Sequence, residues 1–331
     1  MNASGNIWAI VLAAGDGRRL HGLTTNEFGV AVPKQFCSLR GGESLLRNAL
    51  HRAGAIARLE RICTIVAEQH RLWWAPELGS GPLPNIIVQP RNCGTAHGIL
   101  LPLLHILRRD PEARVVLLPS DHHVDDEHVL ALALRRAVRQ LYALSRQILL
   151  LGISPDSADP DLGYIVPGDR VASHLLTVSR FVEKPRAALA QKLIHGGALW
   201  NAFILAARGT ALLELFQTRS PQIVETMRAA VARDQDAPDD PAATTALYHA
   251  LSDVDFSKQV LEGAESRLRV VPVPPCGWSD LGTPTRLAET LQRLPRCGDA
   301  ANDTSTALVG YLNLAAQHAR RQTASGVPAA K

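Results

Sequence analysis

The sequence lacks three features, each of which would define a class of protein. No apolar run approaches the roughly 20 residues that a membrane span needs, so we expect no membrane partner. The five cysteines are scattered, odd in number and without a CxxC pair. This pattern argues against a disulfide framework or a cysteine zinc site, and it favours the cytoplasm. The formal net charge is only +4 over 331 residues, which leaves no general footprint for nucleic acid.

Lysine is scarce as well. The 35 basic residues include only five lysines, so 30 of them are arginines. Two of the five, Lys34 and Lys184, lie beside prolines in turn-like segments. A compact ammonium group can act as a point charge on a phosphate, and we expect that role for both. Chance placement is the alternative, because five is a small number.

What is present is an ordinary globular composition, with 46% hydrophobic and 20% charged residues. In the first half, short β-branched apolar runs alternate with longer segments whose apolar residues recur every three or four positions. The runs predict strands over residues 7–13, 61–66, 85–88, 115–118 and 148–153, and the longer segments predict helices over 44–55, 95–107 and 128–144. Apolar strands separated by helices predict an α/β fold with a parallel sheet covered on both faces. Residues 7–14 have no basic flank before them and run into a glycine turn, so they read as a strand and not as a signal peptide.

The second half is less regular. It predicts strands over 163–167, 179–182, 199–206 and 268–273, helices over 187–195, 209–216 and 221–234, and a surface loop over 234–243. We expect residues 1–294 to form one catalytic domain. Residues 295–331 are expected to form a short tail, with a helix over 306–321 and a frayed end.

Polar residues follow several of the predicted strands, where an open parallel sheet binds its ligands. The first strand runs into Ala13 and Ala14, and then into Gly15 and Gly17, which allow the backbone to approach a phosphate. The alternative is a tight turn between strand and helix. A dinucleotide-binding fingerprint fails because position 20 is Leu, which argues against a nicotinamide-dependent oxidoreductase.

An aspartate follows the fourth strand. Asp121 is well placed there to hold Mg²⁺ near phosphates, and a helix cap or Asx-turn is the alternative. For the adjacent His122 and His123 we favour structural roles over metal binding, because neighbouring side chains point in different directions.

Other polar segments lie between a strand and a helix or place a polar residue at the end of an apolar run, and each has a structural alternative such as a helix entry. They are 89–96 with Gln89, Gly94 and Thr95, 181–185 with Glu183 and Lys184, 199–201 with Asn201, and 278–282 with Asp280.

Taken together and in this order, these segments resemble the sugar nucleotidyltransferase family, and within it the guanylyltransferases that act on mannose 1-phosphate. The resemblance covers residues 7 to about 287, with 33–36 in the form typical of the mannose enzymes. It implies a Rossmann-like, mixed but mostly parallel sheet flanked by helices, which is the GT-A-like nucleotidyltransferase fold. It also implies that GTP and mannose 1-phosphate give GDP-mannose and pyrophosphate with Mg²⁺ as cofactor. Relatives are often dimers, so we expect a homodimer as well.

The resemblance assigns roles residue by residue. Arg19, Lys34 and Asp121 are the implied catalytic residues, and Asp121 and Asp280 the implied Mg²⁺ ligands. The implied contacts to the nucleotide are Ala13, Ala14, Gly15, Gly17, Gln89, Gly94 and Thr95. The implied contacts to the sugar phosphate are Gly163, Glu183, Lys184 and Asn201.

The sequence also departs from the family pattern. Arg91 replaces a glutamate and Cys93 an arginine, which leaves the choice of base open. Ala202 and Phe203 replace a Ser-Gly pair, which predicts a narrower or reshaped sugar site. The same chemistry with another nucleoside triphosphate or with glucose 1-phosphate is therefore one alternative. A sugar-nucleotide-binding protein without turnover is a second.

Overall fold

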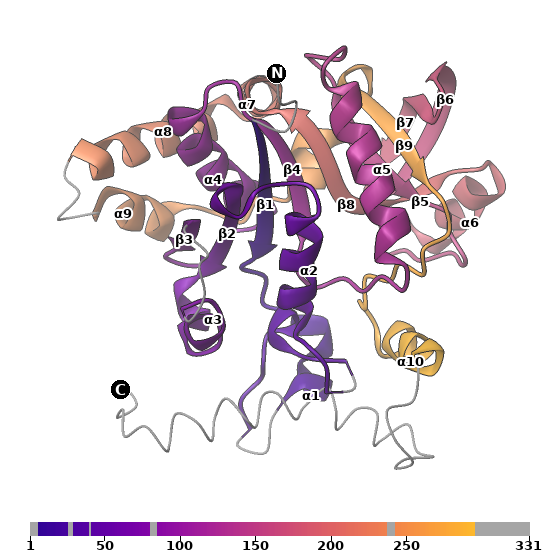
Figure 1. Cartoon of the computed structure of the whole chain (residues 1–331), viewed down its shortest axis with the longest axis horizontal. Helices are drawn as coiled ribbons and strands as arrows, with labels where there is room; N and C mark the ends of the chain where they lie inside the picture. The colour runs from indigo at the N-terminus through magenta and orange to yellow at the C-terminus, as the bar shows by residue number, and fades with distance from the viewer. Residues whose placement is uncertain (1–5, 26–28, 40, 80–84, 237–241, 295–331) are drawn as a thin grey trace.

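A computed structural model describes residues 6–25, 29–39, 41–79, 85–236 and 242–294 (Figure 1). Its centre is a nine-stranded sheet in the order β3-β2-β1-β4-β8-β5-β9-β7-β6. The strands are β1 (Ile7–Ala13), β2 (Ile62–Ala67), β3 (Asn85–Gln89), β4 (Arg114–Pro119), β5 (Ile148–Ile153), β6 (Tyr164–Ala172), β7 (Leu175–Val182), β8 (Leu199–Arg208) and β9 (Leu268–Val273).

Helices flank this sheet. They are α1 (His21–Thr24), α2 (Leu45–Gly54), α3 (Arg71–Leu78), α4 (Thr95–Arg109), α5 (Glu127–Gln140), α6 (Ala187–His195), α7 (Gly209–Arg219), α8 (Pro221–Asp236), α9 (Ala242–Ala250) and α10 (Pro284–Arg293). Among the residues that the structure describes, no helix is long and apolar enough to cross a membrane.

The first four strands form a parallel block. β1 pairs in parallel with β2 and β4, and β2 pairs in parallel with β3. In this register Leu12 lies opposite Pro119, so the carboxyl ends of β1 and β4 meet at one edge. The loops that follow these two strands are therefore brought together, as the sequence predicted.

The second half of the sheet is mixed. β5 and β9 are parallel, whereas β8 runs antiparallel to β4 and β5, and the β6–β7 hairpin is antiparallel throughout. The mixed sheet is confirmed, but the mostly parallel arrangement holds only for the first half. The short β6–β7 connection explains the antiparallel hairpin, because parallel neighbours need a long crossover and a hairpin does not.

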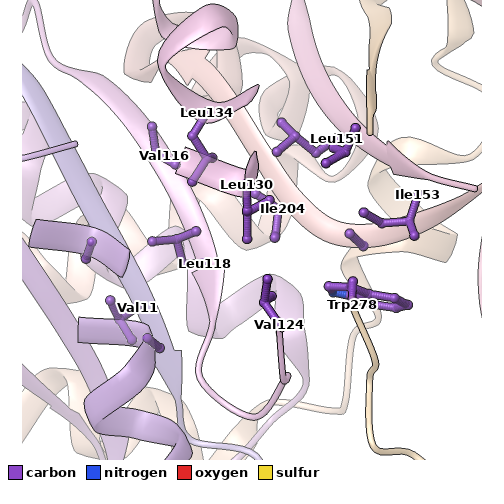
Figure 2. Packing of buried hydrophobic residues seen from close by; sticks show 14 of the residues in the cluster. Val11, Val116, Leu118, Val124, Leu130, Leu134, Leu151, Ile153, Ile204 and Trp278 are labelled. Atoms are coloured by element: carbon purple, nitrogen blue, oxygen red, sulfur yellow. The ribbon is translucent and has the colours of Figure 1, made fainter. Parts of the chain in front are cut away.

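Buried apolar side chains cover both faces of the sheet. Alternate residues of β1 point to opposite sides, with Ala9 and Val11 in one cluster and Trp8 and Ile10 in the other. α2, α5, α6 and α10 pack on the first face, and α4, α7, α8 and α9 pack on the second. Figure 2 shows the first cluster continuing from Val11 to Trp278. The packed core thus reaches the segment that carries Asp280.

The strands and helices predicted within the described residues are all present, with ends shifted by a few residues in most cases. Four helices were not predicted from the sequence: α1, α3, α9 and α10. α3 contains Pro76, which is unfavourable inside a helix and therefore argued against one in this segment, and it buries Trp73 and Trp74. The loop expected over 234–243 is shorter at both ends, because α8 continues to Asp236 and α9 begins at Ala242. The tail over 295–331 and its predicted helix lie outside the described residues.

Candidate active site

A buried lysine lies where the carboxyl ends of β1 and β4 meet. Lys34, in a short helical turn after the first loop, is 5% exposed. Its Nζ atom is 2.9 Å from Asp121 Oδ2 and donates a hydrogen bond of 2.6 Å to the backbone oxygen of Asp280. One ammonium group therefore joins two segments that are far apart in the sequence.

Asp121 follows β4 directly. Ser120 anchors the strand end by donating from its hydroxyl to the Leu12 oxygen, 2.5 Å away. Burial opposes ionisation of Asp121, but the Lys34 ammonium, together with His122 and a backbone hydrogen bond, outweighs burial and holds the pKa of Asp121 below its ordinary value. Asp121 is thus kept as a carboxylate at the end of a central strand.

His122 lies beside this carboxylate, with Nε2 3.6 Å from Asp121 Oδ1. Burial lowers the pKa of His122 to about 4, against the opposing effect of Asp121, so the imidazole is neutral at pH 7. Its ring meets Trp278 edge-on at 5.2 Å. His123, by contrast, turns away and pairs with Asp125 at 2.8 Å. We favoured structural roles for both histidines, and the structure nevertheless brings His122 into the site.

Asp280 comes from the segment after β9. Paired backbone hydrogen bonds of 2.9 Å between His123 and Ser279 bring this segment alongside the Asp121 loop. Asp280 is 4% exposed and has Arg19 3.6 Å from Oδ2 and Arg286 3.7 Å from Oδ1. Oδ1 has no hydrogen-bond partner among the described residues. A buried carboxylate oxygen without a hydrogen-bond donor is open to a cation.

The glycine loop packs against Lys34. Gly17 has φ +65°, and a Cβ there would lie 3.1 Å from the backbone nitrogen of Lys34, so the close approach of the two segments requires glycine. Gly15 is exposed and has open space around it. Gln35 holds the loop in shape by donating to the oxygens of Ala13 and Gly15, each at 3.0 Å. Ala13 and Ala14 are buried beneath the loop.

Arg19 extends from this loop across the site. Its guanidinium is 3.1 Å from Asp161 and 3.6 Å from Asp280, and half of the side chain remains exposed. A fork of donors in this position can bind phosphate oxygens.

A cavity of about 180 Å³ opens next to these groups. It is lined by Arg19, Thr95, His122, Asp161, Leu162, Gly163, Glu183, Lys184, Asn201, Phe203, Asp255, Ser257, Trp278 and Asp280. Seven of the sequence-predicted residues are among them: Arg19, Thr95, Gly163, Glu183, Lys184, Asn201 and Asp280.

Three of the predicted sugar contacts converge on one corner of the cavity. The Asn201 nitrogen donates to the Gly163 oxygen at 2.8 Å, and a Cβ on Gly163 would lie 2.5 Å from Glu183 Oε2. Burial raises the pKa of Glu183 to about 7, although the neighbouring Lys184 opposes this. Glu183 Oε2 has no hydrogen-bond partner among the described residues. Such a carboxyl group can hydrogen-bond a ligand hydroxyl in either protonation state.

Lys184 caps the same corner. Its φ is +47°, and its Nζ is 3.5 Å from Glu183 and 3.4 Å from Asp255. The side chain is half exposed. The ammonium is thus held between the carboxyl groups of Glu183 and Asp255 at the cavity lining.

Gly94 and Thr95 hold a distant segment in the site. Gly94 has φ +87°, and a Cβ there would lie 2.5 Å from the Val254 oxygen. The Ala96 nitrogen donates to that oxygen at 3.0 Å, and Thr95 Oγ1 accepts from the Phe256 nitrogen at 2.8 Å. These contacts bring Asp255 and Ser257 to the cavity wall.

Gln89 lies away from the cavity lining. It is 1% exposed, and the Tyr248 hydroxyl donates to its Oε1 at 3.4 Å. Arg91 donates to the backbone oxygens of Tyr248 and Leu251, and the buried Cys93 thiol to that of Tyr248. The two departures at 91 and 93 therefore fasten the end of α9. A base contact by Gln89 stays a prediction.

Sequence reasoning did not identify several cavity residues as site residues: His122, Asp161, Leu162, Asp255, Ser257 and Trp278. Asp161 and Asp255 carried no motif. Trp278 lay inside the 278–282 segment that resembled the family, and that was the available signal for it.

The described residues contain no group of three or more His, Cys, Asp or Glu side chains placed to hold a metal ion. Asp121 and Asp280 are two carboxylates, and the buried Asp280 Oδ1 has Arg286 3.7 Å away but accepts no hydrogen bond from the described residues. Mg²⁺ usually takes one or two carboxylates and completes its shell with water and substrate phosphates. The pair therefore fits Mg²⁺ brought in with a nucleotide, and does not fit a cage made by protein alone.

Comparison with known proteins finds similar sequences and structures over most of this chain. The mannose-1-phosphate guanylyltransferase of Escherichia coli is 29% identical over 296 residues, which are 87% of this chain and 60% of that protein. Xanthan biosynthesis protein XanB of Xanthomonas campestris is 29% identical over 293 residues, again 87% and 60%. A crystal structure described as mannose-1-phosphate geranyltransferase from Thermus thermophilus is 28% identical with a TM-score of 0.74, covering 88% of this chain and 80% of that one.

The chain spans about 60% of the length of these two curated relatives. The pattern of the nucleotidyl transferase family matches residues 8–296, which include every site residue described above. The chain therefore belongs to the nucleotidyl transferase family, among the sugar nucleotidyltransferases.

Proposed function

We propose that this protein transfers a guanylyl group from GTP to mannose 1-phosphate, giving GDP-mannose and pyrophosphate. The observation that carries the proposal is the Lys34 ammonium, which joins Asp121 to the Asp280 segment beside a cavity with a polar corner. The names of the relatives in Escherichia coli and Thermus thermophilus support mannose 1-phosphate as the acceptor.

In the proposed reaction, an oxygen of the sugar phosphate attacks the α-phosphorus in line. A new bond forms from that oxygen to the α-phosphorus, and the bond from the α-phosphorus to the bridging oxygen of the β-phosphate breaks. Pyrophosphate leaves with the electron pair. The attacking oxygen is already anionic, so no protein nucleophile or base is needed, and catalysis depends on positioning and charge neutralisation.

The residues divide this work. Lys34 neutralises charge on the α-phosphate, and Arg19 exchanges its contact with Asp161 for the leaving pyrophosphate. Glu183 and Asn201 hydrogen-bond the sugar hydroxyls, and Lys184 releases Asp255 to bind the sugar phosphate. Asp121 and Asp280 would hold Mg²⁺, which supplies further neutralisation of phosphate charge when bound.

A second candidate keeps this chemistry and changes the base or the sugar. It is favoured by Arg91 and Cys93, which anchor α9 and leave base recognition to other groups. Glucose 1-phosphate is the main alternative acceptor.

The test is a panel of four nucleoside triphosphates against mannose 1-phosphate and glucose 1-phosphate, with Mg²⁺ and pyrophosphate release as the readout. We expect the largest kcat/KM for GTP with mannose 1-phosphate. A different best pair selects the second candidate. Saturable GDP-mannose binding without pyrophosphate from any pair would instead indicate a binding protein, and would overturn the proposal.

A further inference from the structure

Phe203 adopts a backbone conformation that aromatic residues rarely take. Its φ is +55°, in the left-handed region that favours glycine. The Phe203 nitrogen donates to Asn201 Oδ1 at 3.1 Å, which fixes the turn. A strained residue of this kind persists only where its surroundings enforce it, and such residues gather at ligand sites.

The ring of Phe203 is supported from behind. It meets Phe256 edge-on at 6.2 Å with an interplanar angle of 84°, and Phe256 packs on Phe216 at 5.3 Å. Phe256 and Phe216 are completely buried. Because Thr95 also holds the Phe256 nitrogen, the ring of Phe203 rests on a fixed base and cannot retreat without disturbing the core.

The same ring is part of the cavity lining, together with the corner made by Gly163, Glu183 and Asn201. That corner is closely packed as well, since a Cβ on Gly163 would lie 2.5 Å from Glu183 Oε2 and 3.3 Å from Asn201 Cβ. The space between the aromatic wall and the polar corner is part of a cavity of about 180 Å³. Because two buried phenylalanine rings stand behind it, the aromatic wall cannot move aside for a larger substituent on the sugar.

We propose that Phe203 is a specificity-determining residue that restricts the sugar site to hexose 1-phosphates without an N-acyl group. An acetamido group in place of a hydroxyl adds three heavy atoms to the sugar and collides with the supported ring. The inference rests on the proposed function and names its sugar class.

The test compares sugars that differ only at C2: glucose 1-phosphate with N-acetylglucosamine 1-phosphate, and mannose 1-phosphate with N-acetylmannosamine 1-phosphate. For the wild-type protein with one triphosphate, we expect kcat/KM to favour the hydroxyl sugar by about 100-fold or more. Phe203→Gly suits the positive φ and should reduce this ratio at least about tenfold, mainly through a lower KM for the acetamido sugar.

His174→Gly is the matched control. His174 has φ +63° in the exposed β6–β7 turn and does not line the cavity, so its replacement should leave the ratio unchanged. A thermal melt of each variant reports folding, and Phe203→Ala replaces the glycine variant if that one melts early. A wild-type ratio near one, or equal ratios in Phe203→Gly and His174→Gly, overturns the proposal.

Failure of the proposed transferase activity can be distinguished from failure of the proposed role of Phe203. If no pair releases pyrophosphate, titration calorimetry with glucose 1-phosphate and N-acetylglucosamine 1-phosphate still decides the sugar class. A preference for glucose 1-phosphate over N-acetylglucosamine 1-phosphate that becomes smaller in Phe203→Gly supports the role of Phe203. Equal binding of both sugars, or binding of neither, contradicts it.

Discussion

Replacement of Lys34 by Ala tests the electrostatic account of the site. The Lys34 ammonium is 2.9 Å from Asp121 and 2.6 Å from the Asp280 oxygen, and it is almost completely buried. Two unit charges about 4 Å apart interact by about 4 kcal/mol at an effective dielectric constant of 20. Loss of one preorganised donor in an active site costs about 2.7–4 kcal/mol, which is roughly 10²–10³-fold in rate. The two magnitudes agree, so we expect kcat/KM to fall by a factor in that range.

The assay is steady-state pyrophosphate release by Lys34→Ala, with Lys192→Ala on the exposed surface of α6 as the matched control. Because Lys34 lowers the pKa of Asp121, its loss raises that pKa, and the acidic limb of the pH profile should move to higher pH. About a third of Asp121 is exposed, so the loss of unfolding free energy should stay below about 3 kcal/mol. Activity within threefold of the control would refute the reasoning.

Three further predictions concern the stability of the fold and the binding of Mg²⁺. Gly94→Ala should lower the free energy of unfolding, measured in urea, by at least about 2 kcal/mol, because the added Cβ would meet the Val254 backbone. Gly197→Ala is the control: it is also at positive φ but in open space, and it should lower the free energy of unfolding by only about 1 kcal/mol. Burial raises the pKa of Glu77 from 4.5 to about 7, so between these pH values the native state holds a proton that the unfolded state has released. Stability should therefore fall as pH rises from about 4.5 to 7. Glu77→Gln should flatten this slope in thermal melts across that pH range. Asp280→Asn should raise the Mg²⁺ concentration for half-maximal activity about tenfold or more, and an unchanged Mg²⁺ titration would argue against Asp280 as a ligand.

The sequence predicted the fold where local patterns were strong. β1, β5, β9 and α6 have the predicted bounds, because each is a short apolar run or an amphipathic segment with clear ends. The antiparallel direction of β8 could not be predicted, since strand direction depends on pairing across the sheet and not on local pattern. α3 was missed because Pro76 interrupts a segment whose helical form depends on burial of two tryptophans.

The site was predictable where a residue follows a strand, and unpredictable where a long-range contact places it. Lys34 and Asp121 were identified from their positions beside a turn and a strand end. Asp255 reaches the cavity only because Gly94 and Thr95 hold its segment, and no spacing in the sequence encodes that contact. Gln89 shows the converse, since its position directly after the predicted strand 85–88 suggested a ligand contact, whereas it is the last residue of β3 and its side chain is buried against Tyr248.

The reverse reaction is the most direct test of guanylyl transfer by this protein. The purified protein is incubated with GDP-mannose, Mg²⁺ and radiolabelled pyrophosphate, and the nucleotides are separated. We expect labelled GTP and an equal amount of mannose 1-phosphate, with the label strongly reduced in Lys34→Ala and unchanged in Lys192→Ala. Absence of labelled triphosphate, both with GDP-mannose and with the nucleotide sugars that correspond to the other pairs of the panel, would contradict the proposed transfer.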